Sequence, residues 1–148
     1  MKYALSLVFA AFAALAAVAQ DADDPTPEDM IISAQGVTLD EFRWVKRPLV
    51  VFADTPNDPR FNEQMEYLRA ELPALDARDV IVITDTDPSA DTSIRRTLRP
   101  RGFGLVLVGK DGTIQLRKPT PWAIRELTRA IDKLPARQQE LRERGTGG

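Results

Sequence analysis

The sequence predicts an α/β fold, a three-layer sandwich whose elements follow one another in the order β-α-β-α-β-β-α. Short apolar runs, typical of strands buried on both faces, lie at 48–53, 79–84 and 104–108. In the segments between and after these runs, apolar residues recur at helical spacing. Asp111-Gly112 predicts a hairpin turn, in which both residues supply positive φ angles, before a fourth strand at 113–117.

The first helix is expected directly after the strand at 48–53. Asp58 is the predicted N-cap, Pro59 suits the first helical position, and Pro73 is expected to end the helix. Its buried face is marked by apolar residues at helical spacing, which are Phe61, Met65, Leu68 and Leu72.

Two further helical segments are shorter or less regular. Residues 38–41 have the form of a capping box, and the turn that follows is expected to pack Phe42 and Trp44 onto the core. A short basic helix, marked by Ile94 and Leu98, is predicted to end at Pro100, before the third strand.

The last long helix is expected to be capped by Thr120-Pro121 and to end at Pro135. Its apolar stripe consists of Ile124, Leu127, Ile131 and Leu134. The charged run at 137–144 is interpreted as a solvated helical turn.

Strands that alternate with helices imply parallel pairing through right-handed crossovers, and the hairpin adds one antiparallel strand. This is the order of a thioredoxin-like core. In thioredoxin-like proteins the junction between the first strand and helix carries a cysteine whose thiolate is stabilised by the helix dipole and a nearby cation. This chain of 148 residues contains no Cys and no His. Redox mechanisms that act through a protein thiol are therefore excluded, as is metal binding through thiolate or imidazole.

The amino terminus has the layout of a secretory signal peptide at 1–19. Lys2 is the only charge before Asp21, the segment between them is mostly apolar, and it ends in the small-x-small pattern at 17–19. Cleavage after Ala19 would deliver the protein to the periplasm or the outside of the cell. The alternative is an uncleaved membrane anchor, although the run is short for a spanning helix.

The rest of the chain is expected to contain one domain. Residues 20–36 are acidic and contain proline, which predicts a disordered or extended lead-in. The thioredoxin-like domain is placed at 37–144 and a flexible tail at 145–148. No further apolar run after the signal peptide is long enough to span a membrane.

Several stretches of this domain are similar to an uncharacterised bacterial family of secreted proteins with a thioredoxin-like fold. They lie at 42–44, 47–52, 78–80, 107–112 and 131–138. The family is grouped as the prokaryotic branch of the DUDES superfamily, whose animal members include sushi-repeat-containing extracellular proteins. Leu134 and Ala136 stand where the family usually has methionine. The resemblance implies the fold and export, and it implies no activity, because none is established for the family.

The junction at 54–60 keeps polar residues in place of the missing cysteine. Asp54 and Asp58 could form a carboxylate pair for general acid–base chemistry, but Asp58 is also explained as a helix cap and Asp54 as a strand-end residue. Arg60 lies within the first helical turn and could pair with Asp54 or with an acidic partner. Phe103 occupies the place where thioredoxins have a proline before the third strand.

A basic cluster is the other candidate site. Arg96 and Arg99 lie three residues apart and could share one helical face, which could bind an anion or an acidic partner. The alternative is a solvated face balanced by nearby acids. The basic cluster consists of Arg95, Arg96, Arg99 and Arg101, and the acids are Asp85, Asp87 and Asp91.

Two motif matches are interpreted as coincidences. Asp85-Thr86-Asp87 after an apolar strand matches a phosphatase nucleophile pattern, but the large domain that this chemistry needs is missing. Gly104 and Gly109-Lys110 match most of a phosphate-binding loop, but the residues between them form a predicted strand.

Two functions remain open. The favoured one is a non-catalytic binding or scaffold module of the cell envelope, which would use the groove at 54–60, Phe103 and the basic face to bind an envelope or extracellular protein. The alternative is a cysteine-independent enzyme with Asp54, Asp58 and Arg60 at its centre. The charge is nearly balanced, with 20 basic and 22 acidic residues, which gives no electrostatic reason to expect nucleic-acid binding. No cofactor, metal or catalytic residue is predicted.

Overall fold

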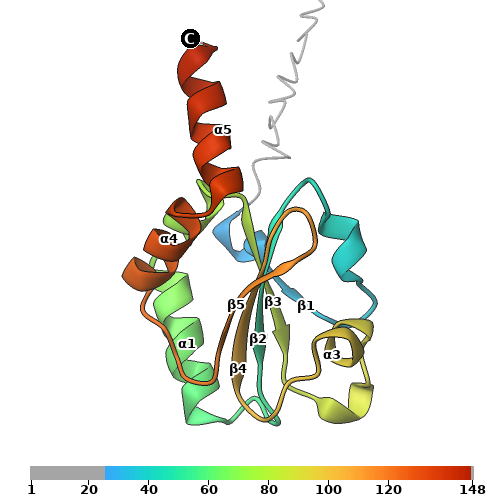
Figure 1. Cartoon of the computed structure of the whole chain (residues 1–148). Coiled ribbons are helices and arrows are strands. Elements are labelled where there is room, and N and C mark those ends of the chain that lie inside the picture. Colours follow the sequence, from blue (N-terminus) through green and yellow to red (C-terminus); the bar gives the residue numbers. More distant parts are fainter. Residues whose placement is uncertain (1–25, 148) are drawn as a thin grey trace, which may run out of the picture.

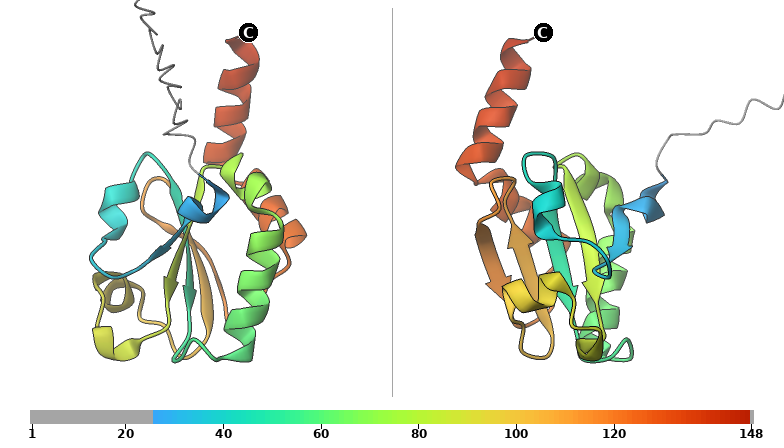
Figure 2. Two further views of the ribbon diagram at one scale, coloured as in Figure 1. Left: turned by 180° about the vertical axis from the view of Figure 1, so that it is seen from behind. Right: turned by 90° about the vertical axis from the view of Figure 1, so that its right-hand side faces the viewer.

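The computed structural model describes residues 26–147, so the predicted signal peptide lies outside the described residues. Within this range the chain folds around one five-stranded sheet with the strand order β1-β3-β2-β4-β5. Helices α1 (Pro59–Ala70), α2 (Leu72–Asp76) and α4 (Ile124–Asp132) cover one face of the sheet (Figures 1 and 2). The other face is covered by α3 (Ser93–Leu98) and by the 3₁₀ helix at Leu39–Phe42. The predicted three-layer α/β sandwich is therefore confirmed.

The expected parallel pairing of strands that alternate with helices is present between the strands at 47–52 and 80–85, but it is wrong for the strand at 104–108, which runs antiparallel to its neighbours. In chain order they are β1 (Ile31–Ser33), β2 (Arg47–Phe52), β3 (Val80–Asp85), β4 (Gly104–Val108) and β5 (Ile114–Lys118). Strand β3 pairs in parallel with both β1 and β2, whereas β4 pairs antiparallel with β2 and β5. Every residue of β2 and β4 is buried, as their continuous apolar runs predict.

The α-helices occupy the segments between and after the strands. They are α1 (Pro59–Ala70), α2 (Leu72–Asp76), α3 (Ser93–Leu98), α4 (Ile124–Asp132) and α5 (Pro135–Thr146). Three single-turn 3₁₀ helices lie at Pro27–Met30, Leu39–Phe42 and Pro88–Ala90. Pro73, expected to end the first helix, stands in the first turn of α2 instead.

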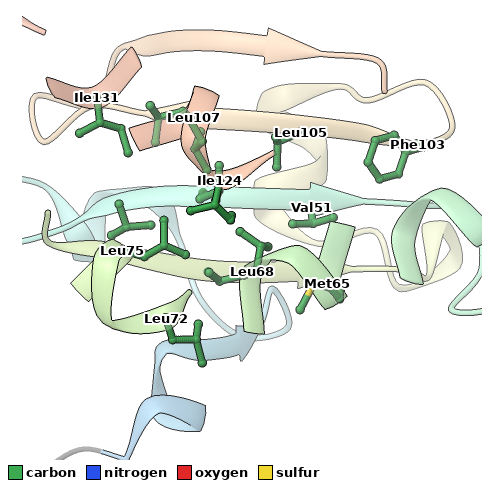
Figure 3. Close-up of a cluster of buried hydrophobic side chains, with 14 residues drawn as sticks. Val51, Met65, Leu68, Leu72, Leu75, Phe103, Leu105, Leu107, Ile124 and Ile131 are labelled. Carbon is green, nitrogen blue, oxygen red and sulfur yellow. The ribbon is translucent and has the colours of Figure 1, made fainter. Parts of the chain in front are cut away.

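The core consists of two hydrophobic clusters, one on each face of the sheet. The larger joins alternate residues of β2, β3 and β4 to the stripes of α1, α2 and α4 (Figure 3). Leu68 of α1 and Leu127 of α4 are fully buried in it, which confirms both predicted stripes. The smaller cluster packs Ile94 and Leu98 of α3 against the other face.

The predicted lead-in needs a correction, because its second half belongs to the folded domain. Residues 31–33 form β1, which adds to the free edge of β3 in parallel register. The Ala34 N–H donates to the Thr84 carbonyl at 2.9 Å, and Ala34 is 1% exposed. The acidic composition misled the prediction, because Ile31 and Ile32 are apolar enough to extend the sheet.

The carboxyl-terminal region also differs from the prediction. Pro135 begins a helix, α5, which continues through Gly145 to Thr146, where a solvated turn and a flexible tail were expected. Helix α5 projects beyond the end of the sheet at which β2 and β3 begin (Figure 1). The N-cap of α4 is Ala123, so Thr120-Pro121 does not cap this helix.

Two smaller predictions about loops are wrong. Phe42 packs against the core, but Trp44 is 72% exposed and has a φ of 67°, a conformation that is rare for a bulky side chain. Its N–H donates to the Lys110 carbonyl at 2.7 Å, which ties this loop to the hairpin. In the hairpin only Gly112 has a positive φ, of 86°, so the expected positive φ of Asp111 is not present.

The predicted cap of α1 is confirmed and supports a stability prediction. The Asp58 carboxylate accepts a hydrogen bond from the Arg60 N–H at 2.9 Å. We expect Asp58→Ala to destabilise the domain by well under half of the effect of Leu68→Ala, because the cap is at the surface whereas Leu68 is fully buried. Urea unfolding of both variants measures the two effects, and equal shifts of their midpoints at unchanged m-values would contradict this assignment of the helix faces.

Candidate functional site

The junction between β2 and α1 is occupied by an internal ion pair. The Arg60 guanidinium lies 3.0 Å from the Asp58 carboxylate, which also accepts the Arg60 backbone N–H. These hydrogen bonds from Arg60 lower the pKa of Asp58 from its usual range. The free amide of Arg60 at the start of α1 is thus satisfied by a residue of the same chain.

Asp54 does not join this pair. It is exposed, and within residues 26–147 its side chain forms no hydrogen bond or ion pair. Arg60 pairs with Asp58, so the expected pairing with Asp54 is not present. The two carboxylates therefore do not share a site, and acid–base chemistry by a carboxylate pair has no geometric support here.

Phe103 connects the junction to a neighbouring cavity. The Arg60 guanidinium carbon lies 5.5 Å from the centroid of the Phe103 ring, within the range of a cation–π contact. Phe103 is 3% exposed and stands at the end of the row of core residues that line β4 (Figure 3). The same residue lines a cavity that we call the basic pocket.

The basic pocket has a volume of about 490 Å³ and lies where β4 begins and β5 ends. Its wall comes from the segment after α3, from the first residues of β4 and from the end of β5. The lining residues are Leu98, Arg99, Pro100, Arg101, Phe103, Gly104, Val106, Arg117, Lys118 and Pro119. Its lining therefore combines apolar and cationic residues.

No carboxylate lines this pocket, although four cationic residues do. Within residues 26–147, Arg99, Arg101 and Arg117 take part in no ion pair or side-chain hydrogen bond. The Lys118 ammonium lies 4.4 Å from the centroid of the Trp122 ring. The pocket thus concentrates positive charge without internal neutralisation, which favours an anionic occupant.

Gly104 leaves space in the lining of the pocket. It pairs with Phe52 in the sheet, and a Cβ placed on it would meet no atom within 4 Å. Its φ lies outside the left-handed region, so a side chain at this position is compatible with the backbone. A substitution at Gly104 can therefore fill the pocket without disturbing the strand.

The structure divides the arginine cluster that the sequence predicted as one candidate site. Arg99 is the C-cap of α3 with a φ of 50°, so it leaves the helical face of Arg96 and enters the basic pocket. Arg96 pairs with Asp91 at 3.1 Å on the exposed surface. The prediction that Arg96 and Arg99 share a face is therefore wrong, because the helix ends between them.

Arg95 has a structural role in the smaller core. Its guanidinium lies 2.8 Å from the Asp85 carboxylate, and the Thr92 hydroxyl donates to the same carboxylate at 2.6 Å. Asp85 is 5% exposed, so this pair is buried and the solvated-face interpretation does not apply to it. Asp87 caps the following 3₁₀ turn. The acidic motif at 85–87 is thus accounted for by local structure.

A second concentration of charge lies at the opposite end of the sheet and was missed from the sequence. Arg47, 1% exposed, pairs with Glu140 of α5 at 2.7 Å. Glu140 also forms ion pairs with Lys110 at 3.1 Å and with Arg137 at 3.2 Å. Lys110 forms a further ion pair with Asp79 at 2.8 Å. We call these five residues the α5 network. It fastens α5 to the sheet.

Burial raises the pKa of Glu140, but hydrogen bonds from Arg47 and Lys110 and the nearby positive charges outweigh it and hold the pKa at about 2. A cavity of about 660 Å³ lies against this network. Its Arg47, Lys110 and Glu140 neutralise one another, unlike the cations of the basic pocket. We therefore take the basic pocket as the candidate functional site.

The fold and the junction define this chain as a thioredoxin-like domain without the redox cysteines. It belongs to the family described as the domain of unknown function DUF4174, whose family model matches residues 38–140. A comparison with curated proteins finds no match.

Solved structures with the same fold include three Plasmodium proteins. The Plasmodium vivax 2-Cys peroxiredoxin in its reduced form is 16% identical, with a TM-score of 0.55 over 70% of this chain and 85% of that one. Plasmodium yoelii Prx1a modified at its N-terminus is 20% identical, with a TM-score of 0.52 over 70% and 81%. Plasmodium yoelii thioredoxin peroxidase I is 17% identical, with a TM-score of 0.51 over 70% and 80%. At these identities the similarity concerns the fold alone.

Proposed function

We propose that this chain is a non-catalytic binding module that works after export and holds an anionic group in the basic pocket. The observation that carries the proposal is the gathering of Arg99, Arg101, Arg117 and Lys118 around one open cavity that no carboxylate lines. The two most buried arginine pairs differ from this pocket, because Arg47 is paired with Glu140 and Arg95 with Asp85. A group of cations without a carboxylate partner favours the binding of an external anion.

The chemistry of the pocket narrows the class of ligand. Guanidinium groups match the planar geometry of a carboxylate or the oxygens of a phosphate, and they bind either through paired hydrogen bonds. Pro100 and Pro119 offer apolar surface beside the cations, whereas the other apolar lining residues, Leu98, Phe103 and Val106, are almost fully buried. An organic anion with an apolar body beside its charged group therefore fits better than a bare inorganic ion.

The enzyme hypothesis receives no support from the arrangement of its residues. Asp58 is held by the helix start and by Arg60, and Asp54 stands apart from both. With no thiol in the chain and no carboxylate pair at the junction, ligand binding without turnover is the simpler proposal.

Export is supported by the amino-terminal pattern of Lys2, the apolar run and the small residues before Gln20. Within residues 26–147, no helix combines the length and hydrophobicity that crossing a membrane would require. We therefore propose a periplasmic or secreted location with an envelope or extracellular protein as partner. Mass spectrometry of the protein from its native compartment is expected to show cleavage after Ala19, and an intact Met1 in the membrane fraction would contradict export.

Binding can be tested with benzoate, which carries a carboxylate on an apolar ring, and with benzamide, which has the same shape without the charge. Titration followed by NMR is expected to show benzoate binding that weakens with salt, and much weaker binding of benzamide. Arg117→Gln should lower the benzoate affinity by about fivefold, which corresponds to about 1 kcal/mol, the size of a modest charge-assisted contact.

The matched control is Arg129→Gln, which removes an exposed charge from α4 on the other face of the sheet. Gly104→Val should abolish benzoate binding by filling the pocket, while circular dichroism shows a native fold. Equal binding of benzoate and benzamide, or an equal loss in Arg129→Gln, would overturn the proposed function.

A further inference from the structure

We propose that the partner of this protein presents an extended acidic segment, which adds as a sixth strand to the edge of the sheet at β5 and places carboxylates at the basic pocket. This inference rests on the proposed function and names the ligand class of the same pocket. It is carried by the position of β5, by the charges on it and by the place of Arg117.

Strand β5 lies at an edge of the sheet, where among the described residues, 26–147, it pairs only with β4 (Figure 2, right). Its outer backbone N–H and C=O groups have no strand partner within residues 26–147. Of its residues, Ile114, Gln115 and Arg117 are exposed. An edge with these properties is a template for an added strand, and main-chain hydrogen bonds supply much of the affinity in such complexes.

The positive charge of β5 determines which kind of peptide strand can bind next to it. Arg117 and Lys118 are both cationic, and the neighbouring Arg99 and Arg101 add positive charge on the side of the pocket. Cations on an edge strand disfavour pairing with neutral or basic strands, and they attract an acidic one. The occupant that matches both the edge and its charge is therefore an acidic peptide in extended conformation.

Arg117 joins the edge to the pocket. It pairs with Val106 of β4, and Gly104 lies two residues before Val106, hence on the same face of the sheet. Side chains of an added strand alternate between the two faces, so every second residue would lie on the face of Arg117. The favoured partner sequence thus alternates acidic and apolar residues.

The test uses two fluorescent peptides of the same composition. In one, Glu and Val alternate over eight positions, and in the other the Glu residues form one block. Fluorescence anisotropy is expected to show binding of the alternating peptide at least about tenfold tighter than of the block peptide, since only the former places all its carboxylates on one face. Arg117→Gln should weaken the binding of the alternating peptide, and Arg129→Gln should leave it unchanged.

Methylation of single backbone nitrogens in the alternating peptide tests strand addition itself. A paired strand directs its N–H groups alternately toward and away from its neighbour, so methylation should weaken binding at every second position only. If all positions respond alike, or if both peptides bind equally, strand addition is overturned. In that case, benzoate binding to the wild-type protein that is abolished by Gly104→Val would still support the anion pocket. Failure of the wild-type protein to bind benzoate would refute the proposed function, whatever the peptides show.

Discussion

Replacement of Glu140 by Gln is expected to lower the free energy of unfolding by about 3–5 kcal/mol, because it removes the carboxylate from a buried arginine. The Arg47 side chain is 1% exposed, and Glu140 is its carboxylate partner within the described residues. Arg47 also donates to the Arg78 carbonyl at 2.9 Å, which cannot neutralise its charge. An unpaired buried guanidinium is costly because it loses hydration without compensation.

Denaturant unfolding of the folded domain measures this effect, with Glu143→Gln as its matched control. Glu143 lies one turn further along α5 and is exposed, and within residues 26–147 its side chain bonds only to Gln139. The control should change the free energy of unfolding by less than about 0.5 kcal/mol. If both variants behaved alike, the α5 network would not fasten this helix to the sheet.

The same carboxylate predicts a dependence of stability on pH. The pKa of Glu140 is lowered from 4.5 to about 2 in the folded protein. The stabilisation is therefore present above the unfolded pKa and is lost as the pH falls through the folded pKa, with a total of up to about 3 kcal/mol. The difference in stability between wild type and Glu140→Gln should shrink between pH 5 and pH 2 by about this amount. A difference that stays constant over this window would contradict the assigned ion pairs.

Leu68→Ala is the second substitution with a large expected effect, of about 2–5 kcal/mol. Leu68 is fully buried between α1 and the sheet, where it lies among Val51, Met65 and Leu72 (Figure 3). Truncation removes apolar contacts and leaves a cavity that the rigid strand behind it cannot collapse to fill.

Leu68→Ala is compared with Tyr67→Ala, its neighbour on the solvent side of α1, of which 37% is exposed. Thermal and urea unfolding should both place the Tyr67 variant close to wild type. A larger loss at Tyr67 than at Leu68 would mean that the buried face of α1 is assigned wrongly.

The strands and the first helix could be predicted because their signals are local. A run such as 48–53 is apolar throughout since both of its faces are covered, and Asp58-Pro59 marks a helix start within two residues. Helix α5 gave no such signal, because charged residues and not an apolar stripe attach it to the sheet. Arg47 and Glu140 lie 93 residues apart, and no local pattern predicts that they meet.

The candidate site could be predicted in part. Phe103 and Arg99 were recognised, and both line the basic pocket. Arg117 was missed because an exposed cation on an alternating strand is ordinary, and Gly104 was missed because the open space beside it is a property of the packed fold. Arg96 was included because a continuous helix was assumed, whereas α3 ends at Leu98.

The central claim is that the basic pocket, and not the junction between β2 and α1, receives the ligand. An amide chemical-shift titration of the purified domain with benzoate compares the two places in one measurement. We expect the amide signals of Gly104 and Arg117 to shift in a saturable way, while those of Asp54 and Arg60 do not shift. Saturable shifts confined to Asp54 and Arg60, with Gly104 and Arg117 unaffected, would contradict this account and return the junction to consideration as the functional site.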